Sequence, residues 1–210
     1  VVPSQASYLT SFVDSSDHVL WWMVCAWGSD FSGWIVDYGT WPDQKRAVFY
    51  KSDLQRKLED ELPGSSWEEC FVNAHNKLEE FLLGREWNVG DSDGITGTKS
   101  VDLMLKDWSD GDHEKRISSQ LRASNYRSRI RPSKGAAPKP GRKPVSKWGD
   151  ARYDRSGPGW VERRIERPMH VQYDTNIWKS HASRRLKTVV GSPSSLVLPG
   201  DDEESLGLLA

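Results

Sequence analysis

Residues 8–41 read YLTSFVDSSDHVLWWMVCAWGSDFSGWIVDYGTW, and this stretch decides the fold class. Three runs rich in aromatic and β-branched residues, which are typical of strands, occupy residues 8–13, 18–28 and 32–41. The Asp, Ser and Gly segments between these runs are short and predict tight turns, so that neighbouring strands are antiparallel. The chain therefore opens with a predicted three-stranded antiparallel meander.

Helical and strand-like segments follow the meander. Apolar residues at helical spacing predict a helix over residues 65–83, capped by Ser65 or Ser66, and a shorter helix over 53–62. Residues 88–100 have the Gly, Asp, Ser and Thr content of an exposed loop. The expected fold class is α/β, with helices that flank the sheet.

A parallel crossover is predicted next. Residues 101–107, 109–125 and 127–133 have the order strand, helix, strand, which places the two strands parallel in one sheet. A strand or hairpin over 160–174 and a helix over 175–190 follow. The sheet is therefore expected to be mixed, an antiparallel meander plus parallel strands.

Positive charge is concentrated in one part of the chain. Residues 122–167 hold 14 Lys and Arg against four acids, an excess of ten, although the formal net charge is −1. Such a stretch fits a polyanion-binding surface and fits equally a solvated loop kept soluble by its charge. Within it, residues 135–159 are rich in Pro, Gly and basic residues and predict a flexible basic loop or arm, mobile without DNA.

Length and motifs exclude several classes of protein. A chain of 210 residues predicts one domain, over 1–190, with a poorly ordered acidic tail over 191–210. It begins Val-Val-Pro without methionine, so we expect a piece of a longer polypeptide.

No apolar run approaches the roughly 20 residues that cross a bilayer, and Cys25 and Cys70 are too few for a disulfide framework. GxSxG, GxxxxGK and paired-histidine motifs are absent, which argues against a serine hydrolase, an ATPase and a zinc site.

Three aspartates stand where predicted strands end: Asp14, Asp107 and Asp174. The carboxyl ends of parallel strands line one crevice, so the first two are expected to be neighbours, with the third approaching from another side. Carboxylates that close resist ionising together unless a cation binds. Oxygen ligands suit Mg²⁺ or Mn²⁺, and two such ions can support phosphodiester hydrolysis. The order predicts a metal-dependent nuclease, although each aspartate alone is more often a turn or cap residue.

Other residues complete the predicted site. Lys179, five residues after Asp174, is placed to contact the scissile phosphate, and Asp110 is a reserve for Asp107 as second ligand. The basic residues expected to contact DNA are Arg129, Arg131, Lys134, Lys139, Arg142, Lys143 and Lys147.

The order of elements and acids is that of the ribonuclease H-like fold, and the motifs resemble one family of it. FVDSSDHVLWWMVCAWGSDFSGWIVDYGTWPDQ, LKDWSDG, RIRPSKG and YDTNIWKSHASRRL are similar to segments of the nuclease domain of tailed-phage terminase large subunits, especially the lambda-like branch. The resemblance spans nearly the whole chain and matches Asp14, Asp107 and Asp174 to the family's metal-binding acids and Lys179 to the lysine that follows them.

This resemblance implies an endonuclease with two Mg²⁺ or Mn²⁺ ions that cuts concatemeric double-stranded DNA in the cytoplasm of the bacterial host. It also implies an N-terminal ATPase motor, missing from this chain, together with a small terminase subunit and a portal as partners. No membrane is expected to be involved. Two alternatives remain open: a catalytically silent DNA-binding or docking module of the packaging assembly, and a cellular ribonuclease H-like resolvase or transposase-type nuclease.

Overall fold

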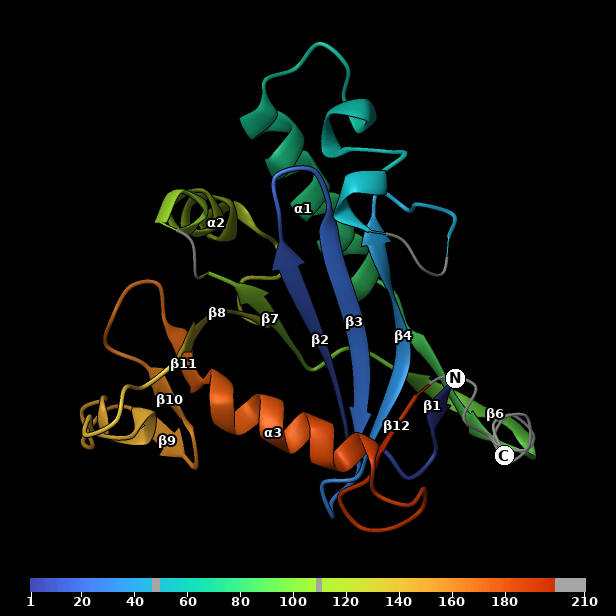
Figure 1. The fold of residues 1–210 in the computed structure, drawn as a ribbon. Coiled ribbons are helices and arrows are strands. Elements are labelled where there is room, and N and C mark those ends of the chain that lie inside the picture. Colours follow the sequence, from blue (N-terminus) through green and yellow to red (C-terminus); the bar gives the residue numbers. More distant parts are fainter. Residues whose placement is uncertain (47–49, 109–110, 199–210) are drawn as a thin grey trace.

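The structure, a computed structural model, describes residues 1–46, 50–108 and 111–198, and its strands lie in two sheets (Figure 1). The strands of the larger sheet are, in chain order, β2 (Tyr8–Ser15), β3 (Leu20–Trp27), β4 (Gly33–Trp41), β7 (Leu103–Asp107), β8 (Ile130–Ala136), β9 (Arg155–Gly157), β10 (Trp160–Arg163), β11 (His170–Asp174) and β12 (Leu196–Val197). The smaller sheet consists of β1 (Val2–Pro3), β5 (Trp87–Asp91) and β6 (Gly94–Lys99). The helices are α1 (Trp67–Leu83), α2 (Gly111–Ala123), α3 (Thr175–Leu186) and the short 3₁₀ helices η1 (Lys51–Asp53), η2 (Leu58–Glu61) and η3 (Val145–Lys147).

The larger sheet is mixed, with the order β12, β4, β3, β2, β7, β8, β11, β10, β9. β2, β3 and β4 pair antiparallel, which confirms the predicted meander. β7 pairs in parallel with β2 on one side and with β8 on the other, which confirms the predicted parallel strands on either side of α2. β8 pairs in parallel with β11, and β11 pairs antiparallel with β10. The predicted α/β class with a mixed sheet and flanking helices is confirmed.

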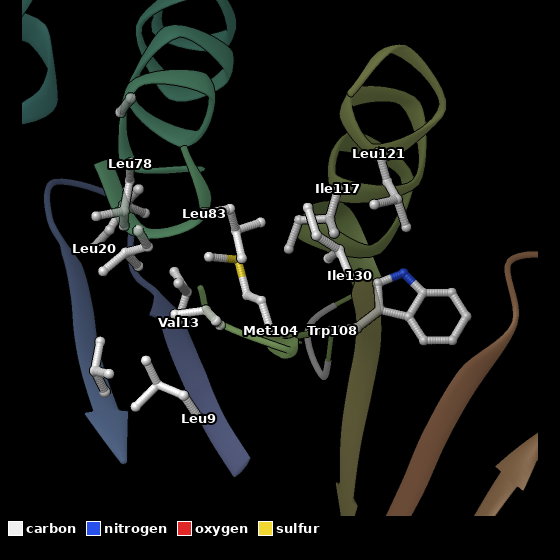
Figure 2. Packing of buried hydrophobic residues seen from close by; sticks show 14 of the residues in the cluster. Leu9, Val13, Leu20, Leu78, Leu83, Met104, Trp108, Ile117, Leu121 and Ile130 are labelled. Carbon is white, nitrogen blue, oxygen red and sulfur yellow. The ribbon is translucent and has the colours of Figure 1, made fainter. Parts of the chain in front are cut away.

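The main hydrophobic core lies on the face of the sheet that α1 and α2 cover. Leu9 and Val13 of β2 point to this face because alternate residues of a strand share a face, and both are fully buried. Figure 2 shows them with side chains from the two helices and from β7 and β8; the labelled ones include Leu78, Leu83, Met104, Ile117 and Ile130. This packing holds β2, β7 and β8 side by side.

The first long helix is capped by Ser66, one of the two predicted cap residues. Ser66 precedes α1, and its hydroxyl accepts a hydrogen bond from the Glu69 backbone N–H at 3.3 Å. The Glu69 carboxylate in turn accepts from the Ser66 backbone N–H at 2.8 Å. This reciprocal capping box satisfies donors that would otherwise be unpaired at the helix start.

α3 covers part of the opposite face, running from the end of β11 toward β12 (Figure 1). Near its end, the Arg185 guanidinium lies over the Trp27 ring, 5.1 Å from the ring centroid. Trp27 donates from Nε1 to the Thr10 hydroxyl at 2.7 Å, so Thr10 of β2 points to the α3 face. Asp14 lies four residues further along the same strand and therefore points to this face as well.

Two sequence predictions about local structure are wrong. Residues 88–100 form most of the β5–β6 hairpin rather than a loop, and β1 extends that small sheet. The β6 side chains are almost all exposed, so no buried face left an alternating pattern in the sequence. Residues 53–62 form no continuous helix and contain η2, in which only Leu58 is buried.

The predicted arm and tail contain regular elements. Residues 135–159 include the end of β8, η3 and β9, and Val145 of η3 is fully buried. The mobility of this arm without DNA stays a prediction. The tail expected over 191–210 begins with described residues that include β12, which pairs in parallel with β4, whereas 199–210 lie outside the described residues.

Two expectations about the whole chain can be compared with the structure. No helix in the described ranges is long and apolar enough to cross a membrane. Cys25 and Cys70 are both buried free thiols.

Candidate active site

Two of the predicted acids, Asp14 and Asp107, meet at the carboxyl ends of adjacent parallel strands. Val13 of β2 is in register with Lys106 of β7, so the two aspartates that follow are level with each other. Lys106 is buried on the α1 face, where its ammonium group pairs with Glu79, and Asp107 therefore points to the other face. The sheet register thus brings both carboxylates to one edge of the sheet on the α3 face.

The charge of Asp107 influences the ionisation of Asp14. The Asp14 side chain is exposed at the strand end, yet neighbouring atoms partly desolvate its carboxylate. This desolvation raises the pKa of Asp14 above its ordinary value of 3.8, and the negative charge of Asp107 raises it further. A hydrogen bond from the Ser15 backbone and the positive charge of Lys51 in η1 act in the opposite direction. Two acids that repel each other at a strand end form a site that a divalent cation would stabilise.

Tyr173 joins this pair, although the sequence did not single it out. Burial raises the pKa of its phenol, and the negative charges of Asp107 and Asp14 raise it further. Tyr173 is in register with Gly135 of β8, where a Cβ would lie 2.7 Å from the Thr175 Cγ2 and 3.4 Å from the Tyr173 hydroxyl oxygen. Gly135 therefore leaves room for the phenol on the α3 face.

Asp174 occupies a different position. Its Oδ1 accepts hydrogen bonds from the backbone N–H groups of Asn176 at 2.9 Å and Ile177 at 3.1 Å, so it is the N-cap of α3. In the sheet register, Asp107 is level with Ser133 and Ser133 with Val171, which places Asp174 three residues further along β11. Two strand spacings and three residues correspond to roughly 14 Å between backbone positions. Its role as third metal ligand remains a prediction.

The remaining predicted site residues are distributed as follows. Lys179 is exposed on α3, and among the described residues it forms no ion pair. Asp110 lies outside the described residues. Lys51 is an exposed cation whose charge acts on Asp14, and no motif in the sequence indicated it.

The described side chains provide two suitable ligands for a divalent cation, but no third one. Asp14 and Asp107 provide hard carboxylate oxygens of the kind that Mg²⁺ and Mn²⁺ take as ligands, alongside water and phosphate oxygens. Within residues 1–46, 50–108 and 111–198, however, no group of three or more His, Cys, Asp and Glu side chains is placed to hold a metal ion. A site built on two acids, with water and substrate as further ligands, is the arrangement that the geometry supports.

Three of the basic residues predicted to bind DNA make contacts within the protein. Arg129 donates to the carbonyl oxygens of Val101 and Leu83, at 3.2 Å and 2.8 Å. Arg131 pairs with Glu162 at 3.4 Å. Lys134 lies 3.6 Å from a Glu114 carboxylate oxygen, and its Nζ is 5.9 Å from the centroid of the Trp108 ring. These contacts connect neighbouring elements, so these three basic side chains help to hold the fold together.

The other four predicted DNA contacts are exposed on the segment between β8 and β9: Lys139, Arg142, Lys143 and Lys147. The segment leaves the sheet at the carboxyl end of β8, two strands away from β2. The predicted arm of residues 135–159 ends next to α3, because the carbonyl of Gly159, in the turn after β9, accepts from the Asp174 backbone N–H at 2.7 Å and from Trp178 Nε1 at 3.2 Å. Both ends of the basic arm are therefore anchored on the edge of the sheet where the strands end.

The comparisons with known proteins leave the family open. No family model, curated protein or solved structure matches this chain.

Repulsion between the two acids leads to a prediction for the metal-free protein. Because the folded-state pKa of Asp14 is raised, ionisation of this group destabilises the fold at neutral pH. Asp14→Asn should therefore raise the melting temperature at pH 7, by only about 2 °C because solvent screens an exposed carboxylate. The difference should shrink as the pH falls below the ordinary value of 3.8, where both folded and unfolded states carry a protonated carboxyl.

Thermal unfolding in EDTA between pH 3 and pH 8 measures this effect. Asp93→Asn, in the exposed β5–β6 turn, makes the same chemical change away from the site and should leave the melting temperature unchanged. A lower melting temperature for Asp14→Asn at pH 7 would contradict repulsion between the acids.

Proposed function

We propose that this chain is a Mg²⁺- or Mn²⁺-dependent DNA endonuclease domain. The observation that carries the proposal is the meeting of Asp14 and Asp107 at the ends of adjacent parallel strands, with a raised Asp14 pKa. The two residues lie 93 positions apart in the chain and converge through the sheet register. Acids placed in this way suit cation binding beside a phosphodiester.

The arrangement of strands supports a ribonuclease H-like fold. The order β4, β3, β2, β7, β8 places an antiparallel meander beside two parallel strands, with the first acid on the central strand and the second on its parallel neighbour. This agrees with the resemblance of the sequence to terminase nuclease domains. On that basis we propose double-stranded concatemeric DNA as substrate, and the ATPase motor, small terminase subunit and portal as partners in the bacterial cytoplasm.

Each part of the site has a role in this proposal. Asp14 and Asp107 would hold the cations, which when bound would supply Lewis-acid activation of a water and charge stabilisation of the departing oxygen. The Tyr173 phenol lies near both acids and donates a hydrogen bond to a phosphate oxygen or water there. Lys51 brings positive charge to the same edge, where it attracts the DNA backbone. Lys139, Arg142, Lys143 and Lys147 of the arm contact phosphates without reading the sequence.

Nicking of supercoiled plasmid by the purified chain tests the proposal. Open-circular and linear products should form with Mn²⁺ or Mg²⁺ and should be absent with EDTA. Activity that persists in EDTA, or the absence of nicking in Mn²⁺ by a chain that still binds DNA, would contradict the proposal.

A second candidate is a catalytically silent DNA-binding module, and the N-cap role of Asp174 favours it, because this acid is engaged in α3. The two candidates share DNA binding and differ in cleavage. Binding measured by fluorescence anisotropy should weaken with salt in both cases. Replacing the four exposed arm residues by alanine should lower the slope of log affinity against log salt by up to about 0.9 for each lost phosphate contact. Salt-sensitive binding without any cleavage in Mn²⁺ would select the silent module.

A further inference from the structure

An arginine-rich groove lies away from the carboxylates, between α2, the start of β8 and the loop that joins β10 to β11. It begins as a cavity of about 280 Å³ lined by Leu121, Ile130 and Met169 and by four arginines. A second cavity of about 550 Å³ continues from it and shares Arg167 and Met169. Figure 1 shows the β10–β11 loop on the same side of the molecule as α2. The residues that define this groove are Arg122, Arg127, Arg131, Arg164, Arg167, Leu121, Ile130, Ile165 and Met169.

The groove combines positive charge with apolar surface. Among the described residues, no acid lies within 4.0 Å ion-pairing distance of Arg122, Arg127 or Arg167. Two other arginines of the groove, Arg131 and Arg164, share Glu162 as a partner, and Glu166 pairs with Arg163 and His170. The uncompensated positive charge of the groove is therefore that of Arg122, Arg127 and Arg167. Leu121 and Ile130, which are only 7 % and 1 % exposed, form the apolar floor. The accessible apolar surface is that of the half-buried Met169 and of Ile165, which is 53 % exposed at the rim. A ligand that fits this groove carries several negative charges next to apolar side chains.

The end of this chain has that chemistry. Residues 201–209 read DDEESLGLL, in which four consecutive acids precede three leucines. Double-stranded DNA would match the arginines but not the apolar floor, so charge and hydrophobicity together favour this peptide segment. The acids are placed to pair with the arginines and the leucines to pack on the floor.

The four acids of this segment are too close to Leu198 in the chain to reach the groove of the same molecule. The described chain ends at Leu198, just after β12, which is five strands away from β8 in the sheet order. Five strand spacings amount to roughly 24 Å. Glu204 lies six residues beyond Leu198, and six extended residues span at most about 22 Å, before any detour around the sheet edge. The tail of a second copy has no such limit.

We infer that the groove binds residues 201–209 of a second copy of this chain, in a head-to-tail contact. Such a contact is heterologous, so it can build rings or chains of subunits. The inference rests on the groove and the tail alone and does not depend on the proposed function.

Peptide binding to the full chain tests the contact. A fluorescent peptide with the sequence of residues 199–210 should bind saturably, and Arg122→Glu with Arg127→Glu should weaken it by about ten-fold or more through charge reversal. Lys77→Glu with Lys115→Glu makes the same charge change at exposed lysines of α1 and α2 outside the groove and should leave binding unchanged. A peptide with Leu206, Leu208 and Leu209 replaced by serine should bind more weakly than the natural one.

Self-association provides a second readout, in which mixing two variants controls for misfolding. Sedimentation velocity should show the mass of the unmodified chain rising with concentration. The groove variant, and a tail variant with Asp201, Asp202, Glu203 and Glu204 changed to lysine, should each stay monomeric. Mixing the two should restore association, because the lysine tail then complements the acidic groove.

Three results would overturn the inference. The first is peptide binding that the groove variant leaves intact, and the second is a chain that remains monomeric at concentrations where the peptide binds. The third is a groove variant that loses affinity for double-stranded DNA but not for the peptide, which would assign the groove to nucleic acid.

Discussion

Replacing Asp107 with asparagine should reduce Mn²⁺-dependent plasmid nicking by at least about a hundred-fold, since each 1.4 kcal/mol of lost transition-state stabilisation corresponds to about ten-fold in rate. Asparagine keeps the shape of the side chain and removes the charge that Asp14 experiences. Asp14→Asn should cause a loss of the same order, because both carboxylates are proposed to hold the same ions. Nicking rates at matched enzyme concentration measure the effect.

The matched control is again Asp93→Asn, which alters an exposed aspartate in the β5–β6 turn. It should nick at the rate of the unmodified chain. Melting temperatures of the site variants at or above that of the unmodified protein would show that lost activity does not reflect unfolding. Undiminished nicking by both Asp14→Asn and Asp107→Asn would remove these residues from the active site.

Replacing Glu79 with alanine should destabilise the fold by about 3–5 kcal/mol, because removal of one partner leaves a buried charge unpaired. Glu79 and Lys106 have side-chain exposures of 2 % and 1 % and form an ion pair between α1 and β7. Glu79 also accepts hydrogen bonds from Gln120 at 2.9 Å and Ser124 at 2.6 Å. Burial lowers the pKa of Lys106, and the Glu79 charge acts against that shift. Without Glu79, the Lys106 ammonium group would remain in the core without its anionic partner.

Thermal and urea unfolding measure this loss, which should lower the melting temperature by about 10 °C. Glu68→Ala breaks an exposed pair between α1 and α2, with Arg116 at 3.1 Å, and should cost less than about 1 kcal/mol. The double variant Glu79→Leu with Lys106→Met should recover most of the stability, because it removes both charges. Equal costs for Glu79→Ala and Glu68→Ala would contradict a structural role for the buried pair.

Much of the fold could be predicted because its signals are local. Aromatic and β-branched runs indicated β2, β3 and β4, and helical spacing with Ser66 indicated α1. The β5–β6 hairpin could not be predicted in the same way, since its exposed side chains carry no hydrophobic period. The pairing of Glu79 with Lys106 depends on the packing of α1 against β7, and no spacing in the sequence encodes it.

The candidate site was predictable to the extent that strand order determines it. Asp14 and Asp107 end β2 and β7, which pair in parallel and bring the two aspartates level with each other. The predicted crossover joins β7 to β8, so it did not by itself determine that β7 pairs with β2. Asp174 is ambiguous because aspartate is both a metal ligand and a favoured N-cap, and in this structure it caps α3. Tyr173, the residue before Asp174 in β11, points to the opposite face of the sheet from Asp174 and lies near Asp107 and Asp14.

Crystals of the chain grown with Mn²⁺, with anomalous diffraction measured at the manganese edge, test the central claim most directly. The account predicts an anomalous peak in direct coordination with carboxylate oxygens of both Asp14 and Asp107, at about 2.2 Å. It also predicts that the peak disappears in crystals of Asp107→Asn. Manganese bound elsewhere on the molecule, with no peak at these two carboxylates, would contradict the account.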